Sequence, residues 1–488
     1  MLELKWDGKD EALEVAKETK THLLELDKNF SFGEKNSGNI IVQGDNLEVL
    51  KSLLPFYRGQ VKCIYIDPPY NTGAAFENYN DNFPHSDWLS MIYPRIELLR
   101  DFLSDDGAIF ISIDDHEQAY LKVICDEIFG ASNFVAQCSV KRSGGRQDSK
   151  FFAVVNEYLI CYAKNANFFT AGEEIKTDEN YPKHDAERGR NYKTQLLRKW
   201  GANSRRADRP NLFYSIPAPD GSELYPMLSA TEDGCWRWGK NKMQQALDDG
   251  LIEFIQKGGK WIAYEKIYEP IDGEARTKKF TTWIDDSGTG ADTVKKIFGE
   301  DVFSYPKAVE LIERVLKMGN VDKNSLVLDA FAGSGTTAHA VINLNATDGG
   351  NRKFILIEQQ DYCKTITAER VRKVGGSFDF YRLGAEITDV EGKINSSVTF
   401  EQLAAFIWFS TTKTPYLEQK NSPLLGIHNG TAIYLLYGAE NILTKKILSA
   451  LPHHDGEKII YGSACRIDEN FLEGNKIIFR QLPKELDL

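Results

Sequence analysis

The sequence predicts an α/β protein with a mainly parallel sheet, split by an inserted domain and followed by a small α+β domain. Two short apolar runs, residues 63–66 and 326–328, each predict a buried strand that ends in a polar turn. Helical apolar spacing alternates with such strands, which is typical of βαβ units. Ligands bind at the carboxyl ends of strands in open α/β sheets, so both turns are candidate parts of a site.

The order of the predicted elements divides the chain into five regions. Strand–helix alternation begins at residue 39, stops near residue 141 and returns after residue 290, which indicates an insertion of a usual domain size. The regions are an N-terminal helical segment (1–38), two halves of the α/β domain (39–140 and 291–384), the inserted domain (141–290) and a C-terminal α+β domain (385–488).

The composition is that of a globular protein without a membrane segment. Its 42% hydrophobic and 27% charged residues are ordinary values, and no apolar run reaches transmembrane length. The seven cysteines form no CxxC pair, which favours a reducing compartment and argues against a metal site or disulfides. No signal peptide is recognised, so we expect a cytoplasmic protein. A net charge of −12 means that contact with nucleic acid requires a local basic patch.

The first candidate site is Asp67-Pro68-Pro69-Tyr70, hereafter the Asp-Pro-Pro-Tyr turn. Its two prolines remove backbone donors and fix φ, so the Asp67 carboxylate and the Pro68 carbonyl form a rigid pair of acceptors. Tyr70 adds an aromatic face. The alternative is a turn that only closes a strand, with Asp67 as a helix cap.

The second candidate site is the segment 331–335, Phe-Ala-Gly-Ser-Gly, hereafter the glycine turn. Its glycines allow close approach of the backbone to a ligand before a helix that starts at Thr336. Asp329 ends the preceding strand, and Glu358 ends the next one, 23 residues after Gly335, a spacing typical of acids that bind ribose hydroxyls. A third glycine of GxGxxG is missing, which disfavours a dinucleotide. The alternative is a βα turn that binds nothing.

Four segments together resemble the β-class adenine-N6 DNA methyltransferases, most closely the modification (Mod) subunits of type III restriction–modification systems. The order of the two turns, with an insertion between them, also resembles that class. The resemblance covers roughly residues 39–380. The segments are Ile66-Asp-Pro-Pro-Tyr-Asn-Thr-Gly73, Met91-Ile-Tyr-Pro-Arg95, Asp106-Gly-Ala-Ile-Phe-Ile-Ser-Ile-Asp-Asp115 and Phe331-Ala-Gly-Ser-Gly-Thr-Thr337.

The resemblance implies a Rossmann-like methyltransferase fold, S-adenosylmethionine as cofactor, and an inserted target recognition domain that binds double-stranded DNA. Asp67, Pro68, Pro69 and Tyr70 would be catalytic. Acceptors that hold the hydrogens of an exocyclic amine expose its nitrogen lone pair. Tyr70 would stack on a base that has left the duplex.

The resemblance also implies roles for residues outside the two turns. Residues 303–307 would bind the methionine end of the cofactor, and Asp45 would lie near its adenine. Ser112 and Asp114 would line the target pocket, although Asp114 could instead cap a helix. The expected cofactor-binding residues are Asp45, Phe303, Tyr305, Pro306, Lys307, Asp329, Phe331, Ala332, Gly333, Ser334, Gly335, Thr336 and Glu358.

A run of basic residues in the insertion predicts the contact with DNA. Residues 188–209 contain eight basic residues and one acid, with aromatic residues interleaved. The alternative is a solvated charged face. The segment Trp236-Arg-Trp-Gly-Lys240 could be a hairpin that faces DNA, but we favour a small satellite core of the inserted domain. The expected DNA-binding residues are Lys141, Arg142, Arg146, Arg188, Arg190, Lys193, Arg198, Lys199, Arg205, Arg206 and Arg209.

Three other functions compete with adenine-N6 methylation. Cytosine-N4 enzymes use the same amine chemistry, but Ser is frequent in them at the position of Asp67. The chain could instead be chiefly a DNA-binding specificity subunit for a nuclease–helicase partner. RNA or protein-glutamine methyltransferases usually carry the two motifs in the reverse order. The resemblance implies a homodimer and a possible restriction subunit as partners.

Overall fold

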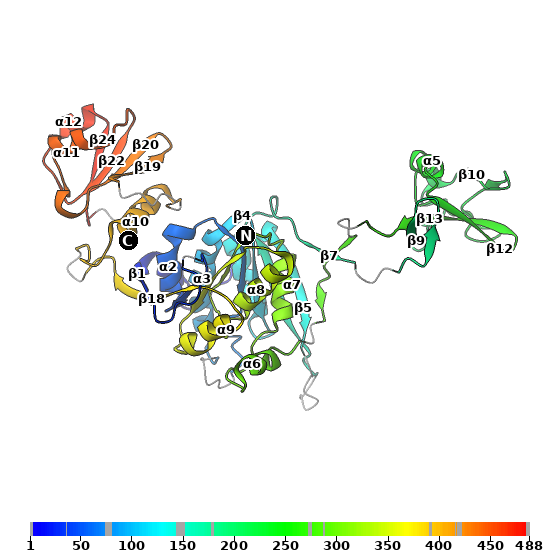
Figure 1. The fold of residues 1–488 in the computed structure, drawn as a ribbon, viewed down its shortest axis with the longest axis horizontal. Coiled ribbons are helices and arrows are strands. Elements are labelled where there is room, and N and C mark those ends of the chain that lie inside the picture. Colours follow the sequence, from blue (N-terminus) through cyan, green and yellow to red (C-terminus); the bar gives the residue numbers. More distant parts are fainter. Residues whose placement is uncertain are drawn as a thin grey trace. The chain divides into compact units, whose positions relative to one another are not determined.

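The computed structural model describes residues 3–35, 37–73, 81–142, 152–176, 180–271, 276–285, 288–389, 393–414, 416 and 422–484. The chain forms two compact units, one of Met1–Glu173 with Phe280–Leu488 and one of Glu174–Lys279 (Figure 1). Within the described ranges, none of the helices could span a lipid bilayer.

The larger unit contains a ten-stranded sheet in its described part. The six strands from β18 to β4 run parallel. The pairs β1–β18, β4–β6 and β6–β5 are antiparallel, and β15 pairs parallel with β5. In spatial order the strands are β1 (His22–Leu26), β18 (Asp379–Glu386), β2 (Ile40–Gln43), β17 (Lys353–Glu358), β16 (Leu326–Asp329), β3 (Val61–Ile66), β4 (Leu103–Ile113), β6 (Asn156–Ala163), β5 (Phe134–Lys141) and β15 (Trp283–Ile284).

Both faces of this sheet are buried, which explains why its central strands are apolar throughout. Side chains alternate between faces, so Ile64 packs in one core cluster while Cys63 and Tyr65 pack in the other. The first cluster includes α2 (Asn46–Tyr57), α3 (His85–Phe102) and α4 (Gln118–Phe129). The second includes α7 (Val309–Met318), α8 (Thr336–Asp348) and α9 (Ala368–Lys373). This is the doubly covered α/β fold that the sequence predicts.

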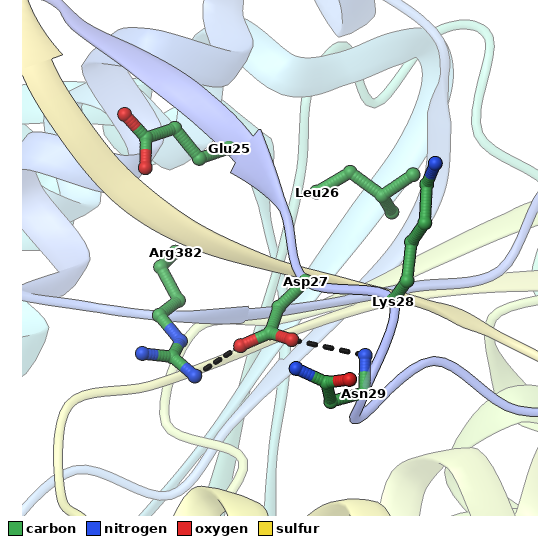
Figure 2. Close-up of a pocket in the computed structure, with 6 residues that line it drawn as sticks. All are labelled: Glu25, Leu26, Asp27, Lys28, Asn29 and Arg382. Atoms are coloured by element: carbon green, nitrogen blue, oxygen red, sulfur yellow. Dashed lines mark hydrogen bonds and ion pairs between the residues drawn. The ribbon is translucent and has the colours of Figure 1, made fainter.

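The N-terminal segment is not purely helical. It contains α1 (Lys9–Glu18), but β1 follows and pairs antiparallel with β18 at the edge of the main sheet. Asp27 forms an ion pair with Arg382 of β18 and accepts a hydrogen bond from Asn29 N at 3.0 Å. Asp27, Asn29 and Arg382 line a shallow hollow at this edge (Figure 2). Pairing with β18 therefore overrides the helical preference of residues 22–26.

The inserted unit begins later and ends earlier than the predicted insertion of residues 141–290. Strand β6 lies in the main sheet between β4 and β5, and β15 pairs with β5. Leu159 and Ile160 of β6 are fully buried, because an apolar strand of this kind needs cover on both faces. The compact inserted unit is Glu174–Lys279.

The inserted unit has its own four-stranded sheet and core. The sheet order is β12 (Ile252–Lys257), β13 (Lys260–Tyr268), β9 (Arg190–Leu196) and β8 (Lys183–Asp185). Helix α5 (Lys240–Asp248) contributes Met243 and Ala246 to the core, together with Trp236 and Trp238. The Trp236–Trp238 segment is therefore a core element, as the sequence favours.

Residues after β18 form a second small sheet. Its order is β19 (Leu424–His428), β20 (Thr431–Leu435), β22 (Lys458–Gly462) and β24 (Ile477–Gln481), accompanied by α10 (Phe400–Thr412), α11 (Lys445–Ala450) and α12 (Glu469–Gly474). Its core includes Leu23 of β1, and Tyr416 N donates to Pro55 O at 3.2 Å. This region thus packs against β1 and the end of α2 and belongs to the larger unit.

Candidate active site

The two candidate turns lie at the same edge of the main sheet. The Asp-Pro-Pro-Tyr turn follows β3, and the glycine turn follows β16. These strands are neighbours and run parallel, with Leu328 opposite Ile64. Their carboxyl ends therefore meet, although the two turns belong to opposite halves of the split domain. Figure 1 shows the elements of both halves within one body.

Hydrogen bonds to the residues before and after Tyr70 fix the Asp-Pro-Pro-Tyr turn. The indole Nε1 of buried Trp88 donates to Pro69 O at 2.7 Å. Asn71 has a positive φ of 63°, and its N–H donates to Asp81 Oδ1 at 2.8 Å. Thr72 N donates to the other oxygen of the same carboxylate at 3.0 Å. The chain is thus held rigidly on both sides of Tyr70.

A cluster of four charged side chains surrounds Tyr70. Lys307 Nζ lies 3.3 Å from Asp67 Oδ1 and donates to Tyr70 Oη at 2.6 Å and to Glu157 at 3.0 and 3.1 Å. Arg142 binds the same carboxylate, with its terminal nitrogen at 2.9 Å from Glu157 Oε2. Asp67 Oδ1 is buried and has no hydrogen-bond partner among the described residues. This oxygen can therefore accept a bond from a ligand.

The charges of this cluster are mutually dependent. Burial raises the pKa of the Asp67 carboxyl above its ordinary value, and Lys307 opposes that rise only in part. Burial would also raise the pKa of Glu157, but Lys307 and Arg142 outweigh it, so that pKa is lowered. Burial alone would lower the pKa of Lys307, yet Asp67 and Glu157 raise it. Lys307 therefore remains an ammonium group.

The glycine turn needs its glycines. Gly333 has φ 50°, its N–H donates to Glu358 Oε2 at 2.8 Å, and an added Cβ would lie 3.4 Å from the Phe303 ring. Gly335 has φ 81°, and a Cβ there would lie 3.1 Å from Thr367 O. Both positions use a backbone conformation that favours glycine. The turn is thus a cradle that side chains would fill.

Asp329 and Thr337 form the floor of the glycine turn. Asp329 is 2% exposed, and it accepts hydrogen bonds from Thr337 Oγ1 at 2.5 Å and Phe331 N at 3.0 Å. Burial raises the pKa of the Asp329 carboxyl to about 7, although both hydrogen bonds oppose this. A nearby cation would lower this pKa again, which makes the site suited to a positively charged ligand group.

The residues around the glycine turn are also fixed. Fully buried Arg370 donates to Ser334 Oγ at 2.8 Å and Thr336 Oγ1 at 2.9 Å. Ala332 is buried beside them. Glu358 also accepts a hydrogen bond from Gln360 N at 3.0 Å. The polar atoms of this turn are therefore oriented before a ligand arrives.

Asp45 caps α2, and the next residue, Asn46, connects the two halves of the edge. The Asp45 carboxylate accepts from Leu47 N at 2.9 Å and pairs with Arg95 at 3.0 Å. Asn46 Nδ2 donates to Ala330 O at 3.0 Å, and its Oδ1 accepts from Arg95. Asn46 therefore holds the start of the glycine turn, while Asp45 fixes Arg95 beside it.

The segment 303–307 does not act as one block. Phe303 lies edge-on to Tyr362 with ring centroids 5.3 Å apart, next to the glycine turn. Tyr305 is 78% exposed with φ 55°. Pro306 passes close to Gly290, whereas Lys307 points to the Asp-Pro-Pro-Tyr turn. The sequence predicts Lys307 at the methionine end of a cofactor, but its side-chain contacts are with the other turn, and only its backbone carbonyl contacts Thr336, at 3.4 Å from Thr336 Oγ1.

Ser112 and Asp114 differ in their surroundings. Ser112 is buried and shares a hydrogen bond of 2.9 Å with Tyr65 Oη below the edge. Asp114 accepts from His116 N at 3.0 Å, and its backbone carbonyl accepts from Gln118 N at 3.2 Å. Asp114 is buried and closes the turn before α4, whose N-cap is Glu117, so it is not the solvated helix cap of the alternative interpretation.

Comparisons with known proteins identify the family. The family model described as DNA methylase matches residues 61–369, a range that includes both turns. This chain belongs to the DNA methylase family. It is 35% identical to the EcoPI Mod subunit of Escherichia phage P1, a type III restriction–modification enzyme, over 84% of this chain and 71% of that protein.

Two further relatives frame the comparison. The chain is 36% identical to the type II methyltransferase M.KpnI of Klebsiella pneumoniae, over 68% of this chain and 82% of that protein. It is 33% identical to the StyLTI Mod subunit of Salmonella typhimurium, over 72% of this chain but only 57% of that protein. The DNA methylase thus spans little more than half the length of one type III relative.

In this DNA methylase, the basic residues of the inserted unit are partly paired. Arg205 pairs with Glu232 at 3.0 Å, and Arg206 pairs with Asp233 at 2.9 Å, all at exposed positions. Arg188, Arg190 and Lys193 lie over the rings of Tyr268 and Tyr181. Arg198 bonds to Lys199 O, while Trp200 is 66% exposed and Arg209 is exposed.

The two described residues of the second predicted basic group, Lys141 and Arg142, have different partners. Lys141 pairs with Asp285 at 3.0 Å, and Arg142 belongs to the charged cluster at Tyr70. Arg146 lies outside the described residues. Arg142 is 41% exposed, so it borders the site and is not enclosed by it.

Sequence reasoning missed several residues that build the site of this DNA methylase, above all Glu157, Trp88, Arg95 and Arg370. Glu157 had a faint signal, because an acid one residue from the start of an otherwise apolar strand is unusual. Arg95 lies within a segment that resembles the family, but its partner Asp45 is 50 positions away. Local patterns carry no information on such pairs.

Proposed function

We propose that the chain transfers the methyl group of S-adenosylmethionine to the N6 amino group of an adenine that has left a short double-stranded DNA site. The observation that carries this proposal is the buried Asp67 Oδ1 without a hydrogen-bond partner, beside Tyr70 and at the edge shared with the glycine turn. Membership of the DNA methylase family gives the reaction class.

The residues of the glycine turn fit the proposed cofactor. The Gly333–Gly335 backbone leaves a cradle that a Cβ would fill, and Phe303 borders it. The Asp329 carboxyl suits the methionine ammonium, because burial destabilises its own charge until a cation arrives. Glu358 accepts one backbone hydrogen bond at each oxygen and retains lone pairs for ribose hydroxyls. S-Adenosylmethionine supplies an electrophilic methyl group on a sulfonium, and the sulfur keeps the C–S electron pair.

The Asp-Pro-Pro-Tyr turn acts on the amine. Asp67 and the Pro68 carbonyl accept hydrogen bonds from the two N–H groups of the amine. The nitrogen lone pair is then free to form the N–C bond with the methyl carbon. Trp88 occupies the Pro69 carbonyl and holds the turn while this happens. Tyr70 stacks on the base, which offsets part of the cost of flipping. The nitrogen then loses one proton, to Asp67 or to solvent.

The inserted unit Glu174–Lys279 is proposed as the target recognition domain. Its run of basic and aromatic residues supplies phosphate contacts and stacking in a protein whose net charge is −12. The relatives named Mod subunits support a role as the modification subunit of a restriction–modification system, with a restriction subunit as partner. Assembly as a homodimer and a cytoplasmic location complete the proposal.

The test is transfer in vitro. Purified protein is incubated with labelled S-adenosylmethionine and genomic DNA from a methylation-free host, and the DNA is digested and its nucleosides are identified by mass spectrometry. N6-Methyladenine supports the proposal. N4-Methylcytosine would support the second candidate, which shares the amine chemistry. Binding of DNA without any methylated base would indicate a specificity subunit and contradict the proposal.

A further inference from the structure

Lys307 reaches away from the glycine turn. Its Nζ contacts two groups of the Asp-Pro-Pro-Tyr turn, Tyr70 Oη at 2.6 Å and Asp67 Oδ1 at 3.3 Å, and Glu157 of β6 at 3.0 Å. The side chain is 17% exposed. Its ammonium has three hydrogens, and the hydrogen bonds to Tyr70 Oη and to the two oxygens of Glu157 account for them, while Asp67 Oδ1 is an ion-pair neighbour only. A carboxylate of the cofactor would have to displace one of them.

Glu157 is the centre of the cluster. It is 5% exposed, and its carboxylate accepts from Lys307 at both oxygens. It also accepts from Arg142 Nε at 3.0 Å. With Asp67, the cluster holds two positive and two negative charges and is therefore neutral. Removal of any one partner leaves an uncompensated charge in a buried place.

Both ends of the Tyr70 hydroxyl are engaged. Tyr70 Oη accepts from Lys307 at 2.6 Å and donates to Glu157 Oε2 at 3.3 Å. These two hydrogen bonds fix the position of the hydroxyl. They therefore prevent the ring from swinging away, although they restrict its rotation about its own long axis less. The ring therefore stays at the place where a flipped base would stack.

We propose that Lys307 and Glu157 are positioning residues of the target-base pocket, which hold the Tyr70 ring and the Asp67 carboxylate for the incoming amine, and that Lys307 does not bind the cofactor. This inference rests on the proposed function and refines it. The Lys307 ammonium attracts one oxygen of the Asp67 carboxylate, and Glu157 holds the ammonium in that position. The raised pKa of Lys307 agrees with this role, because Asp67 and Glu157 keep the ammonium charged despite burial.

The test compares four variants with the wild-type protein. Lys307→Met and Glu157→Gln remove each charge at similar size, and Lys307→Arg keeps the charge. Lys17→Met is the matched control, because Lys17 forms an exposed ion pair with Glu14 at 3.0 Å in α1. Three quantities are measured: the Kd for S-adenosylmethionine, the Kd for DNA, and the single-turnover rate with both bound.

The expected result is a split between rate and binding. Lys307→Met and Glu157→Gln lower the single-turnover rate by about 100-fold or more, on the scale of losing one preorganised electrostatic group, while the cofactor Kd changes by less than about threefold. Lys307→Arg recovers part of the rate. Lys17→Met leaves all three quantities unchanged. Cofactor binding at full stoichiometry confirms that each variant is folded.

Two results would overturn the inference. A cofactor Kd that rises for Lys307→Met by the same factor as the rate falls would place Lys307 at the methionine end. An unchanged rate would show that the cluster has no role in the reaction. If Lys307→Met does not fold, Glu157→Gln and Lys307→Arg decide the same question.

Failure of the proposed function would look different, because the wild-type protein itself would then transfer no methyl group to DNA. In that case a thermal-unfolding cycle still tests the cluster. The fall in Tm of the Lys307→Met, Glu157→Gln double variant should be smaller than the sum of the two single falls. Additive falls in Tm would contradict the coupling on which the inference depends.

Discussion

The two turns at the edge of the sheet are held in different ways. Charged side chains from three separate segments surround the Asp-Pro-Pro-Tyr turn, with Lys307, Glu157 and Arg142 all within reach of Tyr70. The glycine turn is shaped by its own backbone and by neighbours such as Glu358 and Arg370. The first turn is therefore sensitive to charge, and the second is sensitive to added volume.

The largest effect is expected where the charge at the first turn is removed. Asp67→Ala removes both acceptor oxygens, and we expect the methyl-transfer rate to fall by about 10³-fold or to be lost, because preorganised polar groups of this kind are worth this much. Binding of DNA and S-adenosylmethionine should remain. Single-turnover kinetics and equilibrium binding measure both. Retained methylation would contradict the role of Asp67.

The second turn should instead show a pH-dependent affinity. The Asp329 carboxyl has a pKa of about 7. Only its ionised form attracts an ammonium, so the Kd for S-adenosylmethionine should rise as the pH falls, approaching about tenfold per unit well below 7. Calorimetric titrations from pH 5.5 to pH 8 measure this. A pH-independent Kd would show that Asp329 does not hold the ligand cation, and Asp329→Asn supplies the flat reference profile.

Added volume at the glycine turn should weaken cofactor binding. Gly335→Ala places a Cβ 3.1 Å from Thr367 O at a φ of 81°. This contact forces the turn to shift, and overpacking of this kind costs about 1–3 kcal/mol, so we expect the cofactor Kd to rise about tenfold. Gly349→Ala is the control, because it also has a positive φ but lies in open space at the end of α8. An equal rise in cofactor Kd for Gly335→Ala and Gly349→Ala would contradict the sensitivity of the glycine turn to added volume.

The smallest effect is expected in the inserted unit. Arg205 and Arg206 are 71% and 54% exposed, and exposed ion pairs are weak, so both can turn to phosphates. Replacing both by Gln should raise the DNA Kd several-fold and lower the slope of log K against log[salt] by about 2. The methylation rate at saturating DNA should not change. Lys278→Gln, outside the basic run, is the control; an unchanged salt slope for the double variant would exclude these phosphate contacts.

The parts that the sequence predicts correctly are local. The α/β fold follows from apolar runs with polar turns, and the rule that ligands bind at the carboxyl ends of strands makes both turns candidate parts of a site. The pairing of β3 with β16 is known only from the structure. The Asp-Pro-Pro-Tyr turn and the glycine turn are short motifs whose chemistry lies in consecutive residues. Their positions at the same edge match the expectation.

The parts that the sequence does not predict depend on distant pairing. Strand β6 lies in the main sheet because it pairs with both β4 and β5, and no local pattern predicts these partners. β1 forms a strand because β18 offers an edge. Lys307 meets Glu157 across 150 positions of sequence. Its motif places it near the glycine turn, but a long side chain can cross to the neighbouring strand.

The most direct measurement is single-molecule sequencing of DNA from a methylation-free host that expresses this chain, next to the same host with the Asp67→Ala variant. The account predicts N6-methyladenine at one recurring short site with the wild-type chain and none with the variant. Methylation of cytosine N4, or the same N6-methyladenine with both proteins, would contradict it.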